Sequence, residues 1–406
     1  MHVRGGIRAG YRNIEKDIIV IPLINCKTTG FHEINTTLSF FSKERTCAKK
    51  EKIICFSFST GFLFVKKKKC CVILWLIIFE MTLFTCLHKL SQNMGNTLIA
   101  WIKIQELYKH PTIFFPFLLG TAIAWSGAGA IDWRVFAVSI VITYFITNGT
   151  FMSNEYFDYE TDRINKERVG GDRVGVTTTG GTRVLVEGLL PRKHVLIASI
   201  LFFVATIPLG VLLQFHLNTG VLTLPFVILG ILGGWFYTAP PIKASYRGFG
   251  EVLMGIGFTI PIFAGYYVQQ GFSWLPLIVA LPWMVDVPAL KIIREFPDYD
   301  ADVAVNRRNL VVFFGRDAMA PVYILLTVCS LILFVPVIFI INGLEVLLLL
   351  LPAFFLLRSL IPTIKGKWRN KDELEDICKN GFMGMLFILL ALIGIFILRG
   401  FVVSLG

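Results

Sequence analysis

The stretch from Val195 to Leu213 reads VLIASILFFVATIPLGVLL and contains no charged residue. A helix needs about 20 such apolar residues to cross the roughly 30 Å hydrocarbon core of a bilayer. Apolar and polar residues do not alternate along the stretch, as they would in a strand of a transmembrane barrel. The stretch therefore predicts a membrane-spanning helix, in which the backbone hydrogen bonds are made within the segment.

The composition of the whole chain also indicates a membrane protein. Of the 406 residues, 55% are hydrophobic and 16% are charged, whereas charged residues make up about a quarter of an ordinary soluble domain. The formal net charge is +12, but in a membrane protein the side on which each charge falls matters more than the total. We therefore expect a lipid bilayer and no nucleic acid as partner, with basic clusters suited to a diphosphate.

Similar apolar runs recur from Met94 to the C-terminus. They predict an all-α, multi-span membrane helical bundle with nine transmembrane helices around a central cavity. The expected spans are 111–129, 134–153, 194–214, 219–237, 250–269, 273–292, 318–340, 343–363 and 379–403.

The loops between these spans differ in charge. Every second loop is long and basic, as in the loop after the second span with Arg183 and Arg192 and the loop after the fourth with Lys243. The opposite loops are short, and Arg134 is their main basic residue. Because basic loops tend to stay in the cytoplasm, we expect a multi-pass protein of the cell membrane with its charged face in the cytoplasm. An odd number of spans then puts Gly406 on the other side.

Residues 1–93 differ from the rest of the chain. They show no clear helical period, and the basic tract Lys66 to Lys69 precedes an apolar stretch, Val72 to Leu87, that Glu80 interrupts. A signal peptide would have its apolar region closer to the start. The favoured interpretation is an atypical extension upstream of a true start at Met94; an accessory tail and a targeting segment are the alternatives. We expect the membrane domain to be 94–406.

The eight cysteines form no metal-binding or disulfide pattern. Six of them lie in the first 90 residues, and no two are spaced as C-x-x-C. The sequence therefore predicts neither a zinc site nor a disulfide framework.

Two acidic segments repeat at the ends of the second and sixth spans. The first, 154–162, reads NEYFDYETD, and the second, 294–302, reads REFPDYDAD. The matching pairs are Glu155 and Glu295, Asp158 and Asp298, Tyr159 and Tyr299, and Asp162 and Asp302. The copies lie four spans apart at equivalent helix ends, so they indicate an internal duplication that sets the two motifs across a central cavity.

The spacing within each motif suits a divalent cation. Residues four apart share one helix face with Cβ atoms about 5–6 Å apart, which aligns Asp158 with Asp162 and Asp298 with Asp302. Mg²⁺ takes oxygen ligands and keeps water and substrate phosphates in its shell. Two such sites facing each other would clamp a diphosphate. Solvated helix ends are the simpler alternative, but carboxylates beside apolar spans are costly and are usually functional.

These motifs resemble those of the UbiA superfamily of membrane prenyltransferases. The superfamily pattern is N-D-x-x-D-x-x-x-D followed by D-x-x-x-D, and here Asn154 is followed by Glu155 in place of the first Asp. The resemblance extends from Met94 to the C-terminus. It implies an enzyme that transfers a polyprenyl chain from its diphosphate to a small acceptor with the help of Mg²⁺.

Further segments resemble individual branches of that superfamily. Gly180 to Pro191 (GGTRVLVEGLLP) and Tyr246 to Glu251 (YRGFGE) look like the menaquinone branch, which implies 1,4-dihydroxy-2-naphthoate or a related aromatic quinone precursor as acceptor. Tyr237 to Lys243 (YTAPPIK) instead resembles chlorophyll-type and archaeal ether-lipid members. Glycerol-phosphate lipid, hydroxybenzoate, chlorophyllide-like and haem acceptors therefore stay open.

The resemblance also implies roles for individual side chains. Asp158 and Asp162 would bind one Mg²⁺ and Asp298 and Asp302 a second. Asn154 and Glu295 would assist them, Lys243 and Arg294 would bind phosphate oxygens, Tyr237 would donate to the bridging oxygen, and Arg183 would bind phosphate. Each supporting residue has a simpler interpretation: a snorkelling lysine, a basic loop residue or an interfacial tyrosine.

Three other classes of protein remain as rivals. A transporter also uses repeats and acidic helix ends, but its sites tend to lie at mid-membrane rather than at one face. A soluble-type isoprenyl diphosphate synthase shares Asp-rich motifs but would not need nine spans. A purely structural membrane protein would leave the paired motifs unexplained.

Overall fold

The computed structural model describes residues 54–58, 61–65, 96–164, 181–304 and 306–405. The chain divides into two compact units, Met1–Lys89 and Leu90–Gly406. In the first unit, strands β1 (Ile54–Phe58) and β2 (Gly61–Val65) form an antiparallel hairpin with Ile54 opposite Val65. The expected basic tract 66–69 and the apolar stretch 72–87 lie outside the described residues, and the interpretation of 1–93 stays a prediction.

The second unit is a bundle of helices, which confirms the predicted fold class. Its first half contains α2 (Asn96–Lys103), η2 (Leu107–Lys109), α3 (Pro111–Ala128), α4 (Trp133–Phe157), α5 (Tyr159–Ile164), α6 (Arg192–Val211), η3 (Leu212–His216), α7 (Thr223–Phe236) and η4 (Ala244–Tyr246). Its second half contains α8 (Gly250–Gln270), α9 (Leu275–Arg294), α10 (Tyr299–Ala304), α11 (Leu310–Phe314), α12 (Arg316–Ile332), α13 (Phe334–Ile341), η5 (Leu344–Leu349), α14 (Leu350–Ile364), η6 (Lys367–Arg369) and α15 (Lys371–Leu405).

The expected count of nine spans is not confirmed. Among the described residues, eight helices are long and apolar enough to cross a membrane, and α7 is shorter, with 14 residues. At 1.5 Å per residue a helix of that length covers only about 21 Å, less than a bilayer core of roughly 30 Å. The apolar run 219–237 suggested a full span, but α7 begins only at Thr223 and ends at Phe236.

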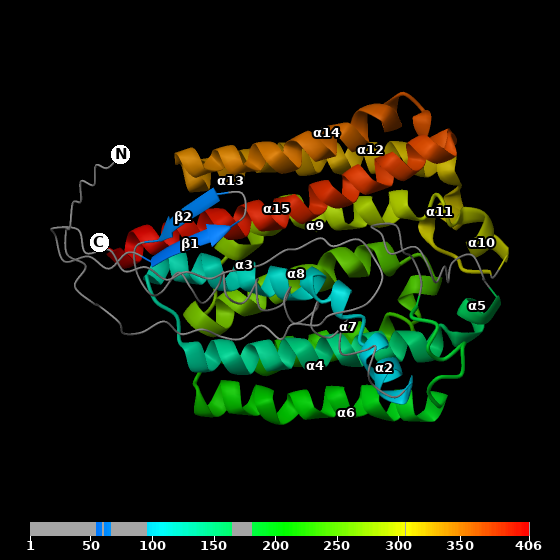
Figure 1. Cartoon of the computed structure of the whole chain (residues 1–406), viewed down its shortest axis with the longest axis horizontal. Helices are drawn as coiled ribbons and strands as arrows, with labels where there is room; N and C mark the ends of the chain where they lie inside the picture. Colours follow the sequence, from blue (N-terminus) through cyan, green and yellow to red (C-terminus); the bar gives the residue numbers. More distant parts are fainter. Residues whose placement is uncertain (1–53, 59–60, 66–95, 165–180, 305, 406) are drawn as a thin grey trace, which may run out of the picture. The chain divides into compact units, whose positions relative to one another are not determined.

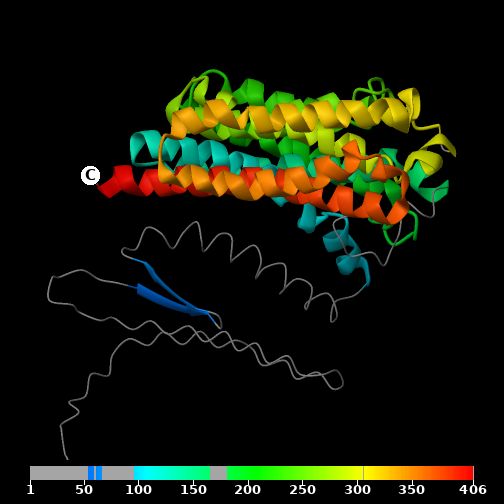
Figure 2. The same ribbon diagram turned by 90° about the horizontal axis from the view of Figure 1, so that it is seen from above.

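The long helices run side by side, as the two views show (Figures 1 and 2). Helix α4 packs against α6 and α7, while α9 packs against α8 and α12, and α14 packs against α15. The two halves meet mainly where α3 packs on α8 and on α15. Between α3 and α8, a Cβ on Gly120 would collide with the Ile262 carbonyl and a Cβ on Gly265 with the Phe117 carbonyl, so glycine allows the two backbones to approach.

The duplication is visible in the order of elements. Helix α4 carries the first acidic motif at its end and is followed by the six-residue helix α5. Helix α9 carries the second motif and is followed by the six-residue helix α10. This arrangement brings both motifs to the same side of the bundle, where the candidate site lies.

Candidate active site

A cavity of about 1000 Å³ lies between α3, α4, α7, α8 and α9. Apolar side chains line most of it, and polar side chains gather where α4 and α9 end. The motif residues that line this single cavity are Asn154, Glu155, Asp158, Asp162, Glu295, Asp298 and Asp302. All four predicted magnesium-binding aspartates therefore border one space.

Each motif contains a helix break, which its sequence spacing did not reveal. Asp158 is the C-cap of α4 and donates its N–H to the Asn154 carbonyl at 2.8 Å, and α5 begins at the next residue. The Asp162 N–H nevertheless donates to the Asp158 carbonyl at 2.9 Å, and the Asp302 N–H donates to the Asp298 carbonyl at 2.8 Å. The predicted four-residue spacing therefore survives the break in both copies.

Neutral donors hold the first motif. The Tyr246 hydroxyl donates to Asp158 at 2.5 Å, and the Thr238 hydroxyl donates to the Asn154 side-chain oxygen at 2.8 Å. The Thr182 N–H and hydroxyl both donate to Glu155, at 2.8 and 2.9 Å. The buried Glu155 carboxylate thus anchors the segment that begins at Gly181.

The contact of this segment with the first motif requires a glycine at position 181. A Cβ at that position would collide with carboxylate oxygens of both Glu155 and Asp162. The glycine therefore lets the backbone lie against the acidic motif. Gly180, the other member of the predicted glycine pair, lies outside the described residues.

A cation and an amide hold the second motif. The Lys291 ammonium pairs with Glu295 at 2.7 Å, and the Asn309 amide donates to Asp302 at 2.7 Å. Burial raises the pKa of Glu295, while the Lys291 charge opposes that rise and favours the ionised carboxylate. Burial likewise raises the pKa of Tyr237, so its phenol keeps its proton at neutral pH and can act as a donor.

The donor set fits Mg²⁺ as a cation shared with a substrate. Among the described residues no group of three or more His, Cys, Asp or Glu side chains forms a ready metal cluster. The aspartates instead come in pairs of hard oxygen ligands around one cavity. Mg²⁺ is typically held in that way, by one or two carboxylates together with water and substrate phosphates.

Not every predicted residue reaches the cavity. Tyr237 and Arg294 line it, but Lys243 is exposed in the left-handed conformation, with φ 47°, and is not part of the lining. The Arg183 side chain lies 3.3 Å from Glu187 and is also not part of the lining. The roles predicted for these side chains stay predictions.

Sequence reasoning missed three charged lining residues and a hydrogen-bond partner of Asp158. Lys291, Lys109 and Glu106 line the cavity, and Tyr246 bonds to Asp158. A lysine inside an expected span was a signal for Lys291, because ionisable residues at membrane depth are usually functional. No local pattern pointed to Lys109 or Glu106, whose positions depend on tertiary packing, and the segment that begins at Tyr246 stood out only through its resemblance to one branch of the family.

Comparison of the sequence with known protein families identifies the family of the chain that carries these two motifs. The profile of the UbiA prenyltransferase family matches residues 113–386. The chain belongs to this family. It is therefore a multi-pass membrane enzyme that transfers prenyl groups.

Two curated UbiA-family relatives are similar at low identity. The 1,4-dihydroxy-2-naphthoate octaprenyltransferase of Bacillus subtilis is 23% identical over 228 residues, which cover 56% of this chain and 68% of the relative. The UbiA prenyltransferase domain-containing protein 1 of Danio rerio is 24% identical over 250 residues, which cover 61% of this chain and 69% of the relative.

A solved structure supports the UbiA fold. A digeranylgeranylglyceryl phosphate synthase superposes with a TM-score of 0.57 at 19% identity, over 75% of this chain and 99% of that one. At that identity the likeness concerns the fold alone. Naphthoate and glyceryl phosphate enzymes thus both occur among the similar proteins, so membership of the family does not fix the acceptor.

Proposed function

We propose that this prenyltransferase moves a polyprenyl chain from its diphosphate to 1,4-dihydroxy-2-naphthoate or a related aromatic quinone precursor, in a Mg²⁺-dependent reaction. The observation that carries the proposal is the convergence of Asp158, Asp162, Asp298 and Asp302 on one cavity with an apolar wall. A diphosphate needs cations at one end and its isoprenoid tail needs an apolar channel. One cavity offers both.

The chain's own residues bind and orient the donor. The two aspartate pairs would hold Mg²⁺, which supplies neutralisation of the diphosphate charge when it is bound. Arg294 and Lys291 line the same end and would bind phosphate oxygens. The Tyr237 hydroxyl, kept protonated by burial, would donate to the bridging oxygen as the carbon–oxygen bond breaks.

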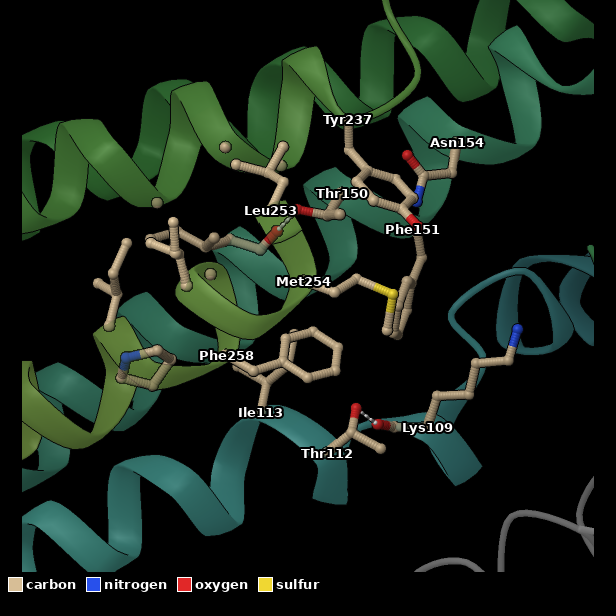
Figure 3. Close-up of a pocket in the computed structure, with 18 of the residues that line it drawn as sticks. Lys109, Thr112, Ile113, Thr150, Phe151, Asn154, Tyr237, Leu253, Met254 and Phe258 are labelled. Carbon is tan, nitrogen blue, oxygen red and sulfur yellow. Dashed lines mark hydrogen bonds between the residues drawn. The ribbon is translucent and has the colours of Figure 1, made fainter. Parts of the chain in front are cut away.

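The apolar wall protects the reacting carbon. Cleavage leaves an allylic cation and releases diphosphate. The electron-rich acceptor ring attacks that cation to form the new carbon–carbon bond, and the attacked ring carbon then loses its proton, or its carboxylate as CO₂, which restores the aromatic ring. Water would compete for the cation. Phe151, Met254 and Phe258 surround the space beside the polar end (Figure 3) and would keep water from it.

The identity of the acceptor and the side of the membrane that the site faces are also part of the proposal. The segments 180–191 and 246–251 support the naphthoate acceptor through their likeness to the menaquinone branch. The B. subtilis relative carries that acceptor in its name. The basic loops support a site that faces the cytoplasm.

A transfer assay tests this function. The purified protein in lipid nanodiscs would receive geranylgeranyl diphosphate and either dihydroxynaphthoate, hydroxybenzoate or geranylgeranylglyceryl phosphate, with Mg²⁺ or with chelator. We expect a prenylated naphthol that requires Mg²⁺. Product only with a different acceptor would overturn the acceptor, and absence of product with all three from folded protein would overturn the proposed function.

A further inference from the structure

The cavity extends well beyond the polar end where the aspartates lie. Its lining on α4 runs from Asn154 back to Ser139, and its lining on α8 runs from Leu253 to Val268. Asn154 and Ser139 are 15 residues apart, as are Leu253 and Val268. At 1.5 Å per residue, each stretch covers about 22 Å of helix. The proposed reaction assigns roles to side chains near the polar end only.

Hydrogen bonds hold the other ends of the lining helices together. The Gln269 amide, near the end of α8, donates to the Asp132 carbonyl at 3.2 Å and accepts from the Asp132 N–H at 2.9 Å, just before α4 begins. The Leu222 N–H, just before α7 begins, donates to the Tyr267 hydroxyl of α8 at 3.1 Å. The start of α4, the start of α7 and the end of α8 therefore meet at one end of the cavity, the far end.

Packed side chains close this far end. Five of the lining residues there form what we call the floor: Leu213, Thr223, Phe226, Val227 and Val268. Phe226 is the largest of them, and its ring lies 5.6 Å from the Phe263 ring and 5.4 Å from the Tyr267 ring, centroid to centroid. The other four floor residues are buried. The floor is therefore a packed apolar layer rather than an opening.

The surroundings beyond the floor are polar. A second cavity, of about 670 Å³, lies there, and its lining includes Asn218, Gln269 and Gln270. Val268 lines both cavities, so the floor separates them. A hydrocarbon tail that passed the floor would meet these polar side chains and would gain little from being buried among them. The apolar path of a tail therefore ends at the floor.

The side of the cavity nearer the polar end differs from the floor. Leu229 and Leu232 of α7 and Ile256 of α8 line the cavity and are also exposed. Lipid would contact these side chains in a membrane. A tail too long for the floor would have to bend away from the straight path and leave between α7 and α8.

The distance between the polar end and the floor limits the tail that fits in a straight path. Each isoprene unit adds four chain carbons, which span about 4–5 Å when the bonds of about 1.5 Å are extended. Four units therefore span about 16–20 Å, within the roughly 22 Å of the lined helices. Six units span about 24–30 Å and exceed it.

We propose that Phe226 and the other floor residues determine the length of the prenyl donor, so that the cavity takes a chain of four isoprene units in preference to a chain of six or more. This inference rests on the proposed function and narrows its donor to a geranylgeranyl diphosphate. Phe226 then sets specificity from the end of the cavity that lies far from the reacting carbon.

Donor binding measured without an acceptor tests the inference. Geranylgeranyl and hexaprenyl thiolodiphosphate, which react slowly, would each be titrated with Mg²⁺ into the protein in lipid nanodiscs. We expect the wild type to bind the geranylgeranyl compound about tenfold more tightly, because forcing extra groups into a packed site is unfavourable by roughly that factor. Phe226→Ala opens the floor and should remove most of this preference.

A substitution that fills the far end should act in the opposite direction. The Ser139 hydroxyl is buried, lines the cavity and has no hydrogen-bond partner among the described residues, so replacing it breaks no bond. Ser139→Leu shortens the cavity and should shift the preference from geranylgeranyl to farnesyl thiolodiphosphate by about tenfold relative to the wild type. An unchanged ratio of the two affinities would contradict the role of the floor.

A matched phenylalanine serves as the control. Phe215 lies in η3 near Leu213, but it is 66% exposed and does not line the cavity. Phe215→Ala should leave both affinity ratios unchanged. If the wild type binds the hexaprenyl compound as tightly as the geranylgeranyl one, and Phe226→Ala keeps that equality, long tails leave between α7 and α8 and the inference is overturned.

Prenyl transfer separates this inference from the proposed function. The affinity ratios need no acceptor, so they can be measured whether or not product forms. The expected ratios together with an absence of product with every acceptor would leave the floor standing and overturn the proposed function. Transfer from geranylgeranyl and hexaprenyl diphosphate with equal kcat/KM would leave the function standing and overturn the inference.

Discussion

The two acidic motifs are near copies in sequence, yet the structure uses their first carboxylates in different ways. Glu155 accepts two hydrogen bonds from the neutral Thr182 and anchors the following segment. Glu295, its counterpart, pairs with the Lys291 ammonium. Asp158 and Asp298, by contrast, border the same cavity and keep the same spacing to the next aspartate. The duplication therefore preserved the aspartates and their spacing, while the two glutamates, which also line the cavity, are held by different partners.

The largest effect should come from the shared aspartates. If each motif binds one side of the diphosphate, Asp158→Ala and Asp298→Ala should each lower kcat/KM by about 100-fold or more, as expected when a main electrostatic stabiliser is lost. Steady-state transfer with geranylgeranyl diphosphate measures this. A variant of either motif that keeps near wild-type activity would show that the copies are not equivalent.

The two glutamates should differ in their effect on stability. Glu295→Gln leaves the Lys291 charge without its partner and should lower the free energy of unfolding by about 3 kcal/mol. Glu155→Gln keeps an oxygen that can still accept from Thr182 and should cost about 1 kcal/mol. Thermal unfolding in detergent compares them, with Lys291→Gln/Glu295→Gln expected to recover part of the loss. Equal losses of unfolding free energy in Glu155→Gln and Glu295→Gln would contradict the different roles assigned to the two glutamates.

A substitution at Gly181 tests the first motif further, because Gly181 lies close to Glu155 and Asp162 of that motif. Gly181→Ala would push a methyl group into the Glu155 and Asp162 carboxylates. We expect a loss of about 1–3 kcal/mol of stability, as for other overpacked sites, together with reduced activity. Gly127→Ala is the control, since a Cβ there meets nothing within 4 Å and Gly127 does not line the cavity. A neutral Gly181→Ala would mean that the segment does not need its close approach to the motif.

The smallest effect should come from the donors that hold the aspartates. Tyr246→Phe removes the hydrogen bond to Asp158, and Asn309→Leu removes the one to Asp302. Each change should cost about 1 kcal/mol in Mg²⁺ binding or in the free energy of unfolding. The Asn309 change should cost somewhat more, because that side chain also caps α11 by accepting from the Val312 N–H at 2.7 Å. Titration of activity with Mg²⁺ compares the two. An effect of Tyr246→Phe as large as that of Asp158→Ala would make the tyrosine part of the reaction itself.

Much of the fold could be predicted from the sequence because lipid imposes a simple rule on apolar runs. The expected span 250–269 corresponds to Gly250–Gln270, and 273–292 corresponds to Leu275–Arg294. Where the rule failed, at α7, the apolar run began at residue 219, before the helix itself begins at Thr223. Hydropathy depends on composition and does not show where a helix begins.

The candidate site was predictable only where the motif repeats. The four aspartates and Asn154 line the cavity as the repeat suggested. The resemblance implied roles for Lys243 and Arg183 in basic loops, but neither a resemblance nor charge tells which loop residues turn inward. Lys109 and Glu106 could not be found in this way, because η2 borders the cavity through tertiary packing rather than through any motif.

The most direct measurement of the central claim is donor binding without chemistry. Isothermal titration of geranylgeranyl thiolodiphosphate, which reacts slowly, would compare the wild type with Asp158→Ala and Asp298→Ala, with and without Mg²⁺. We predict that the wild type binds only with Mg²⁺ and that each single variant loses most of this affinity, because both motifs hold the same diphosphate. Full Mg²⁺-dependent affinity in either variant would contradict the account.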